Sequence, residues 1–590
     1  MVSPFPRGRL VAALLAGAVL HAPSSAQTSR SDAAHIVRRM EFGASIAEVD
    51  ALIGPTLNFH NYALAQLNPG VESGEAESLV KLYTNFPFTP VGPGSSPDLN
   101  VIPPVTQPAG LTIQELSEVN IALALTSSHQ LREKLTQYWQ KRLNTNYFKL
   151  RTVLQGAPFN LSATDAGRYA AHFEWEQNAG LRANALGDFR DLIEVSAGGA
   201  AMLIYLDGVS NHYNGMPQNP NAPNQNYGRE LLELSTLGVD GWRLDPSTGM
   251  WVRGPTYTFQ DLIAMSRVFS GFELVDTNPT GAPSYAVQFN GAKHFILDPI
   301  AGPQLITVFA STPLAPALTF MEDLSGPSEK TAVLDYLAAH PHTRLSVISD
   351  LWRLLIGGDA PDPNNPTIQS AFNAWGPRGN INAVLQVLVL SPEFLTTNRW
   401  TEARLPLEVV GQLYDGMAGN LHDPAAMPAA NRAKLAQLRT AMSEYMGRDL
   451  FTFPSPDGFP FENDKQLTTM RLLGANRLRQ ELYSTFTPGS PSYPYVSGGI
   501  GYDTVGLLAA YGVSDTNPTA IADFLCRVLF ADDHSTSDEF YVHDILLRDP
   551  SGAISATTLA MDKISAPAVY NQRLSRGFAL AASLSLNNLK

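Results

Sequence analysis

Apolar side chains recur at steps of three and four residues along most of the chain after Thr112. Clear examples are LSEVNIALAL, LREKLTQYWQKRL, FRDLIEVSAGGAAMLIYL, RLSVISDLWRLLI and INAVLQVLVLSPEF. This spacing is that of amphipathic α-helices, so the sequence predicts a mostly α-helical, multi-helix globular body with long Pro/Gly-rich loops. Strand signals are few, and no alternating strand–helix pattern supports a doubly wound sheet. Only MWVRG and YAVQFNGAKHFIL are expected to form short β-hairpins.

Two predicted helices begin with residues suited to capping them. Thr112 stands three residues before Glu115, which fits a capping box that opens a helix at Ile113. Thr258 precedes FQDLIAMSRVF and is predicted to cap that helix.

The first residues have the layout of a secretory signal peptide. Arg7 and Arg9 precede a short apolar stretch from Leu10 to Leu20, and small residues end at Ala26, after which cleavage is expected. The apolar stretch is too short to span a bilayer, and no later segment has the character of a membrane span. The sequence thus predicts an exported protein, periplasmic or extracellular, with no stable membrane insertion after cleavage.

The charge balance argues against one class of partner. Of the 590 residues, 16% are charged, and the formal net charge is −14. A chain this acidic is poorly suited to nucleic acid, which requires a positive surface, so no nucleic-acid partner is expected. The single cysteine, Cys526, cannot form an internal disulfide, and its apolar surroundings predict a buried small side chain.

Proline-rich stretches suggest how the chain is divided. PFTPVGPGSSPDLNVIPPVTQP carries too many prolines for a helix, so residues 87–110 are predicted to form a linker. Ahead of it stand the signal peptide, residues 1–26, and an N-terminal helical segment, residues 27–86. Residues 111–485 are predicted to form the main helical domain. Residues 486–590 form a C-terminal segment of uncertain fold, either separate or part of the same domain.

The segment NQNYGRELLELSTLGVDG, residues 224–241, carries most of the functional information. It follows a loop rich in asparagine and proline and closes on Gly238, a residue typical of helix C-termini. At about 100° per residue, its apolar side chains fall on nearly every side of the helix. Helices of this kind are normally buried, so we predict a buried helix.

Charged residues share one arc of this helix. Arg229 and Glu233 are four residues apart and can form an ion pair. Glu230 is left over, between Leu234 and Leu237 on the helical wheel. An ionised carboxylate without a partner is costly in the interior, so Glu230 must find a cationic partner or hold a proton.

Three interpretations of the cluster stay open. In a hydrolase, one glutamate would act as general acid and the other as base or nucleophile, on an extracellular or periplasmic polymer such as a polysaccharide. In a non-catalytic structural or assembly protein, the same charges would be an ion-pair network. In a metal-stabilised binding protein, the two glutamates would ligate a hard cation with Asp207 or Asn226. The candidate catalytic residues are Glu230, Glu233, Arg229 and, from the next predicted helix, Arg267.

The same segment resembles the signature of the domain of unknown function 1800 family, Asn-Glu-Asn-Tyr-Ala-Arg-Glu-Leu-Leu-Glu-Leu-His-Thr-Leu-Gly. Other blocks are also similar, among them AHIVRRMEFGAS, GDFRDLIEVSAGGAAMLIYLD, YTFQDLIAMSRVFSGF, HPHTRLSVISDLWRLLI, LSPEFLTTNRWTEARLPLEVV and PSPDGFP. The similarity extends from His35 to about Arg477. Because the family has no settled activity, the resemblance implies an architecture and leaves the reaction open.

The chain departs from the family signature at positions that could carry chemistry. The family's glutamate, alanine and histidine are Gln225, Gly228 and Ser235 here, and the histidine of its Trp-His segment is replaced by Gln140. If those histidines act in relatives, this chain lacks their chemistry.

A second charged group lies near the N-terminus. His35, Arg38 and Arg39 fall on one predicted helix. They could bind a substrate carboxylate or sulfate, but a solvated basic face is the expected arrangement, since arginine is mostly exposed in folded proteins.

Overall fold

A computed structural model of the chain describes most residues after the predicted signal peptide. The described residues are 27–70, 75–80, 82–83, 112–213, 223–244, 247–248, 250–278, 280, 283–310, 315–416, 428–460, 466, 468–483, 504–531, 533–584 and 589. The signal peptide predicted at 1–26 and the linker predicted at 87–110 lie outside them.

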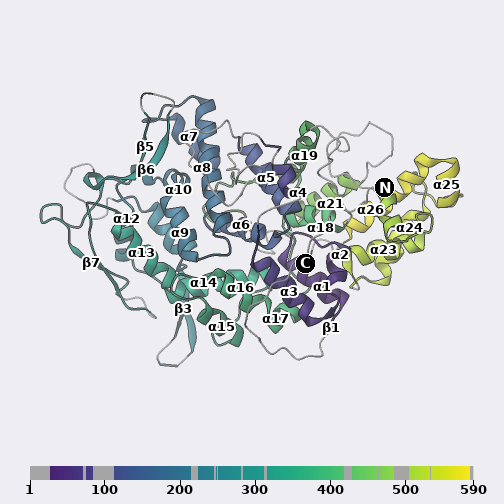
Figure 1. The fold of residues 1–590 in the computed structure, drawn as a ribbon, viewed down its shortest axis with the longest axis horizontal. Coiled ribbons are helices and arrows are strands. Elements are labelled where there is room, and N and C mark those ends of the chain that lie inside the picture. Colours follow the sequence, from purple (N-terminus) through teal and green to yellow (C-terminus); the bar gives the residue numbers. More distant parts are fainter. Residues whose placement is uncertain are drawn as a thin grey trace.

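The described chain is mostly α-helical, as the periodicity predicts (Figure 1). The N-terminal helices are α1 (Arg30–Met40), α2 (Ile46–Leu52), α3 (Thr56–Leu67) and α4 (Glu75–Val80). The middle of the chain forms α5 (Ile113–Thr126), α6 (Gln130–Arg142), α7 (Tyr147–Gln155), α8 (Ala163–Ala183), α9 (Phe189–Gly198), α10 (Ala200–Tyr205), the 3-10 turn η1 (Gly208–Ser210), α11 (Asn226–Glu230), the π-helical turn η2 (Leu231–Ser235) and α12 (Phe259–Val268).

Further helices follow α12 along the described chain. They are α13 (Ser328–Ala339), α14 (Pro341–Leu355), α15 (Pro366–Ala374), α16 (Ile381–Val389), α17 (Pro392–Thr396), α18 (Pro406–Gly416), α19 (Pro428–Met446), α21 (Thr469–Tyr483), α22 (Thr504–Ala510), α23 (Pro518–Phe530), α24 (Thr536–Leu547), α25 (Leu559–Ser565) and α26 (Pro567–Ser583). The segment after 485, whose fold the sequence left open, is therefore helical where it is described.

The strands form two-stranded antiparallel sheets. They are β1 (Gln27–Thr28) with β2 (Gly54–Pro55), β3 (Asp240–Leu244) with β4 (Trp251–Pro255), β5 (Phe272–Asp276) with β6 (Tyr285–Phe289), and β7 (Leu305–Val308) with β8 (Leu318–Met321). The short hairpins predicted around MWVRG and YAVQF are confirmed, and each pairs with the strand that precedes it in the chain. The residues after YAVQF form the 3-10 turn η3 (Gly291–Lys293) instead of a second strand.

The predicted caps are present. Thr112 and Glu115 form a reciprocal capping box at the start of α5, and Thr258 with Asp261 forms another at the start of α12. The buried state expected for Cys526 is confirmed, and burial raises the pKa of its thiol to about 12. Among the helices that the structure describes, none is long and apolar enough to cross a membrane.

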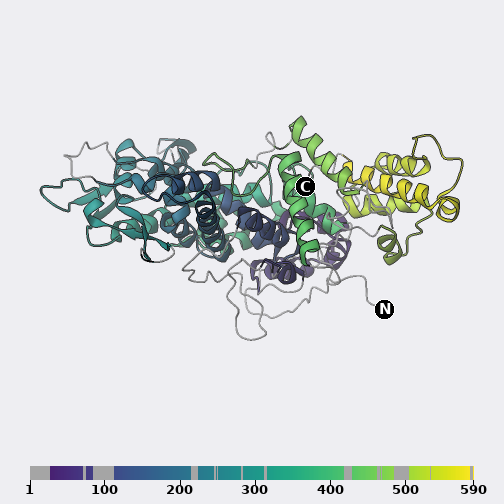
Figure 2. The same cartoon turned by 90° about the horizontal axis from the view of Figure 1, so that it is seen from above.

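Two apolar clusters hold the helices together along an elongated molecule (Figures 1 and 2). The first joins α1, α3, α6, α8 to α10 and α13 to α16, and the predicted site helix lies in it. The second joins Leu123 of α5 and Val410 of α18 to Leu525 of α23 and Phe578 of α26. The C-terminal helices thus share a core with helices of the main body, while the boundary at 485 stays a prediction.

The basic residues of α1 are buried, so the expectation of a solvated face is wrong. His35, Arg38 and Arg39 are at most 5% exposed, because α1 packs against α3, α6, α14 and α17. One nitrogen of each arginine donates to a backbone carbonyl: Arg38 Nη2 to Leu529 at 2.6 Å and Arg39 Nη2 to Asn398 at 2.6 Å. Burial lowers the pKa of His35 to about 3, which keeps that imidazole neutral.

Candidate functional site

The segment singled out in the sequence forms α11 followed directly by the π turn η2. The Thr236 hydroxyl donates to the carbonyl of Leu231, five residues earlier, at 2.7 Å. Gly238 has a φ of +80°, and its N–H donates to the carbonyl of Leu232 at 3.0 Å. The predicted glycine stop is confirmed. Isolated π turns are uncommon in proteins, and those that occur are often found at functional sites.

One face of this helix is open to solvent, so the prediction of burial on all sides is wrong. Leu231, Leu232 and Leu237 are buried in the core, but the Arg229 side chain is 44% exposed. The helix packs on α12, where Gly228 lies directly over Met265, and this contact turns Arg229 outward.

The expected ion pair between Arg229 and Glu233 is present. Arg229 Nη1 lies 3.2 Å from Glu233 Oε1, and the Tyr257 hydroxyl donates to the same oxygen. A cation and a phenol therefore both contact the Glu233 carboxylate.

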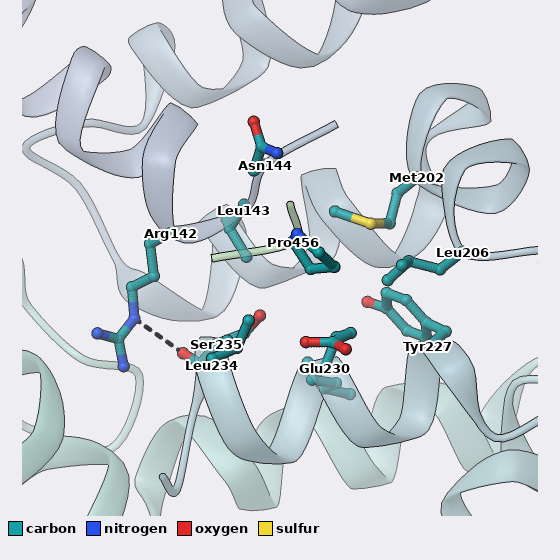
Figure 3. A pocket seen from close by; sticks show the side chains of 11 residues that line it. Arg142, Leu143, Asn144, Met202, Leu206, Tyr227, Glu230, Leu234, Ser235 and Pro456 are labelled. Atoms are coloured by element: carbon teal, nitrogen blue, oxygen red, sulfur yellow. Dashed lines mark hydrogen bonds between the residues drawn. The ribbon is translucent and has the colours of Figure 1, made fainter. Parts of the chain in front are cut away.

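Glu230 has a different environment, although it is only three residues away. Its half-buried side chain lines a small pocket with Tyr227, Met202, Leu206 and Pro456. Figure 3 shows the Glu230 carboxyl group directed toward this space, with Pro456 across from it. The empty volume is about 240 Å³, which includes open solvent.

Burial raises the pKa of Glu230, and the charge of Glu233 raises it further. Arg229 acts in the opposite direction, and Asp457 adds a smaller upward effect. Among the described residues, none donates a hydrogen bond to the Glu230 carboxyl group. The sequence predicted one carboxyl group without a partner. In the structure this group is Glu230: its pKa is raised, and no arginine among the described residues is bound to it.

The arginine beside the pocket is Arg142, at the end of α6, which the sequence did not indicate. Its Nε donates to the Ser235 carbonyl at 3.0 Å, as Figure 3 shows. Its other nitrogens reach Asp350, Tyr138 and Ser346. Arg142 therefore fixes the end of the π turn, and its charge is neutralised by Asp350 rather than by Glu230.

Arg267, the fourth predicted site residue, is not among the residues that line the pocket. Burial lowers its pKa, and the charge that opposes this effect is Glu322. The structure therefore brings together Arg229, Glu230 and Glu233, while Arg267 interacts elsewhere.

A loop from the PSPDGFP block forms the opposite wall of the pocket. Asn144 Nδ2 donates to the carbonyls of Phe453 at 3.1 Å and Ser455 at 2.8 Å. The Tyr205 hydroxyl donates to the carbonyl of Pro454 at 2.7 Å. These bonds hold the loop over the site and place Asp457 close enough to affect the pKa of Glu230. The sequence showed that the PSPDGFP block resembles a block of the family. Only the fold shows that this block faces α11.

A second carboxyl group with a raised pKa lies on α8. Glu174 is fully buried, and burial raises its pKa to about 8. The Thr145 hydroxyl donates to Glu174 Oε2 at 2.7 Å, and Glu174 Oε1 has no partner. The charges of both Glu230 and Glu174 help to raise the pKa of Tyr205, which places the Tyr205 phenol near both acids.

The proposed metal ligands beside the two glutamates are engaged with other groups. Asp207 lies 2.8 Å from the ammonium of Lys149 and accepts a hydrogen bond from Asn226 at 3.0 Å. Within the described part of the chain, a group of histidine and acidic side chains with metal-binding spacing occurs at Asp523, His534 and Glu539, on the C-terminal helices.

The fold and this pocket define a mostly α-helical protein with a protonatable carboxyl group in a small concavity. The chain matches the family model described as "Protein of unknown function (DUF1800)" over residues 35–572 and therefore belongs to that family. The resemblance found in the signature segment is thus confirmed over nearly the whole chain. Comparisons with curated proteins and with solved structures found no match.

Proposed function

We propose that this protein is exported and hydrolyses an extracellular or periplasmic polymer, with Glu230 as the proton donor. The observation that carries the proposal is the state of Glu230, which faces a pocket, lacks a bound cation and has a raised pKa. A general acid must hold its proton near the working pH, and burial next to a second carboxylate is a common way to achieve this.

The second carboxylate of the proposed mechanism is Asp457. It stands on the loop across from Glu230 and is exposed to solvent, so it can contact water. Asp457 would take a proton from water as the oxygen attacks the scissile bond, while Glu230 gives its proton to the leaving oxygen. Glu233, held by Arg229 and Tyr257, is the neighbouring carboxylate that, after burial, contributes most to the raised pKa of Glu230.

The pocket limits what can bind. The empty volume includes open solvent, so the concavity beside Glu230 is far smaller than typical small-molecule sites. It has room for a water molecule or the tip of a polymer side group, and the rest of a polymer chain would lie across its mouth. Met202, Leu206 and Pro456 supply apolar contacts.

The experiment uses the mature chain, residues 27–590, with a panel of bacterial polysaccharides and an assay for released reducing ends. Glu230→Gln is expected to lower the rate about 100-fold or more, the usual contribution of a general acid. Glu176→Gln is the matched control, because this partly exposed glutamate on α8 lies outside the pocket. Equal rates in the wild type and Glu230→Gln would reject the proposal, as would the absence of cleavage across the panel.

A structural role for the cluster makes a different prediction. If Glu230 serves only in an ion-pair network, Glu230→Gln should lower the melting temperature. On our proposal the substitution removes a group that burial disfavours in its charged form, so the melting temperature at neutral pH should stay equal or rise.

Export is supported by the charged and apolar pattern that ends at Ala26. The mass of the protein recovered from the medium or the periplasm should correspond to a chain that begins at Gln27. Recovery of the uncut chain in the cytoplasm would contradict this part of the proposal.

A further inference from the structure

Three side chains meet between α23 and α24, two helices that lie side by side at one end of the molecule (Figure 1). Asp523 lies on α23, Glu539 lies on α24, and His534 lies in the connection between them. One oxygen or nitrogen atom of each lies within 4.8 Å of those of the other two. All three side chains are partly exposed, so an ion could reach them from solvent.

The orientation of the His534 ring defines the state of its nitrogens. Nδ1 lies 3.0 Å from the carbonyl oxygen of Ala531, which can only accept, so Nδ1 carries a hydrogen. In the neutral ring, Nε2 then has a lone pair. That nitrogen faces Glu539 Oε1 at 2.7 Å. A lone pair and a carboxylate oxygen repel at this distance, so a cation is required between them, either a second proton or a metal ion.

The neighbouring charges favour a cation with more than one positive charge. Asp523 contributes a second carboxylate, and its orientation is fixed by Arg527, whose Nη2 donates to Asp523 Oδ2 at 2.7 Å. Asp538 lies close enough that, with Asp523 and Glu539, it raises the pKa of the Cys526 thiol, although burial is the larger cause. Asp523, Glu539 and Asp538 carry three negative charges and Arg527 offsets one of them, so a divalent cation would balance the group.

We propose that Asp523, His534 and Glu539 bind a divalent transition-metal cation, with Zn²⁺ as the representative ion. One imidazole and two carboxylates form a known ligand set for such ions, and water would complete the coordination. The histidine follows the usual pattern of a metal ligand, since its other ring nitrogen donates to a backbone carbonyl.

The bound ion would link α23 and α24 and stabilise the C-terminal helices. Two ligands on one zinc ion lie roughly 3.3 Å apart, given bonds of about 2.0–2.1 Å. The 2.7 Å separation between His534 and Glu539 would therefore widen by about half an ångström, which small side-chain rotations can supply. This site is independent of the Glu230 pocket and does not rest on the proposed hydrolysis.

The test is calorimetric titration of the metal-free mature chain with ZnCl₂, with thermal melting in parallel. About one Zn²⁺ per chain is expected, with a rise in melting temperature that grows with metal concentration. His534→Ala should weaken binding about tenfold or more, because it removes a ligand. His543→Ala is the matched control, since His543 lies on α24 outside the cluster.

Glu539→Gln is the second variant, in case His534→Ala folds poorly, and it should weaken binding to a similar degree. The absence of zinc binding to the wild type would overturn the proposal and leave a protonated histidine–glutamate pair. Equal affinity in the wild type, His534→Ala and Glu539→Gln would also overturn it, because zinc would then bind elsewhere.

Discussion

Glu230 and Glu233 have the same side chain and lie three residues apart, yet different groups surround their carboxylates. Arg229 and Tyr257 bind the Glu233 carboxylate, whereas no described residue donates a hydrogen bond to Glu230. The sequence allowed the prediction that one acid is in surplus, because an i, i+4 pair uses only one of two glutamates. It could not show which groups face the other acid, because Pro456 and Arg142 reach the pocket from distant parts of the chain.

Glu174 gives the clearest prediction at this scale. Its folded pKa of about 8 lies above that of an unfolded glutamate, so the buried group contributes full stability only below about pH 4.5. That contribution is lost as pH rises toward 8. Glu174→Gln should remove this pH dependence and raise the free energy of unfolding at pH 8 by on the order of 4 kcal/mol.

Urea denaturation of both proteins at pH 5 and pH 8 provides the measurement. Glu176→Gln, on the same helix, should leave the pH dependence unchanged. If the free energy of unfolding changes equally with pH in the wild type and in Glu174→Gln, Glu174 ionises normally in the folded protein.

At the scale of elements, the sequence predicted correctly those features that depend only on neighbouring residues. The threonine caps at 112 and 258, the glycine stop at 238 and the strand MWVRG all lie where the sequence predicts. The π turn was not predicted, because Leu231–Ser235 would also fit a regular α-helix. The prediction that the arginines of α1 form a solvated face failed because of packing. These arginines donate to carbonyls of distant segments, which the periodicity of the sequence cannot identify.

Gly238→Ala tests the end of the site helix. A side chain at a φ of +80° costs roughly 1–2 kcal/mol, so the free energy of unfolding should fall by about that amount. The measurement is a urea melt, with the Zn²⁺-free protein used throughout. Gly302→Ala gives a comparison at another left-handed position with open space around it. A much larger loss at 238 than at 302 would mean that the helix end also carries packing energy.

At the scale of the molecule, the apolar clusters run across the boundaries that proline content suggests. Leu525 and Phe578 pack in the same core as residues of α5 and α18. Composition located the interruptions in the chain, but a shared core depends on contacts between residues far apart in sequence. The family match over residues 35–572 likewise extends past residue 485.

Truncation tests this shared core. A chain of residues 27–485 would expose the apolar faces that α18 and α21 bury against α23 and α26. Each fully exposed large apolar side chain costs about 1.5–3 kcal/mol, so the shortened chain should lose its cooperative thermal transition. Circular dichroism melts of the two chains provide the comparison. A cooperative transition at the temperature of the full chain would show that residues 486–590 form a separate domain.

The central claim is that Glu230 keeps its proton above the usual range because it faces the pocket without a cation. Difference infrared titration of the wild type against Glu230→Gln isolates the carboxyl band of this one residue from that of Glu174. The account predicts a band that persists above pH 4.5, the ordinary value for glutamate. A band that is lost at or below that pH would show that Glu230 is ionised, and the proposed acid would then have no physical basis.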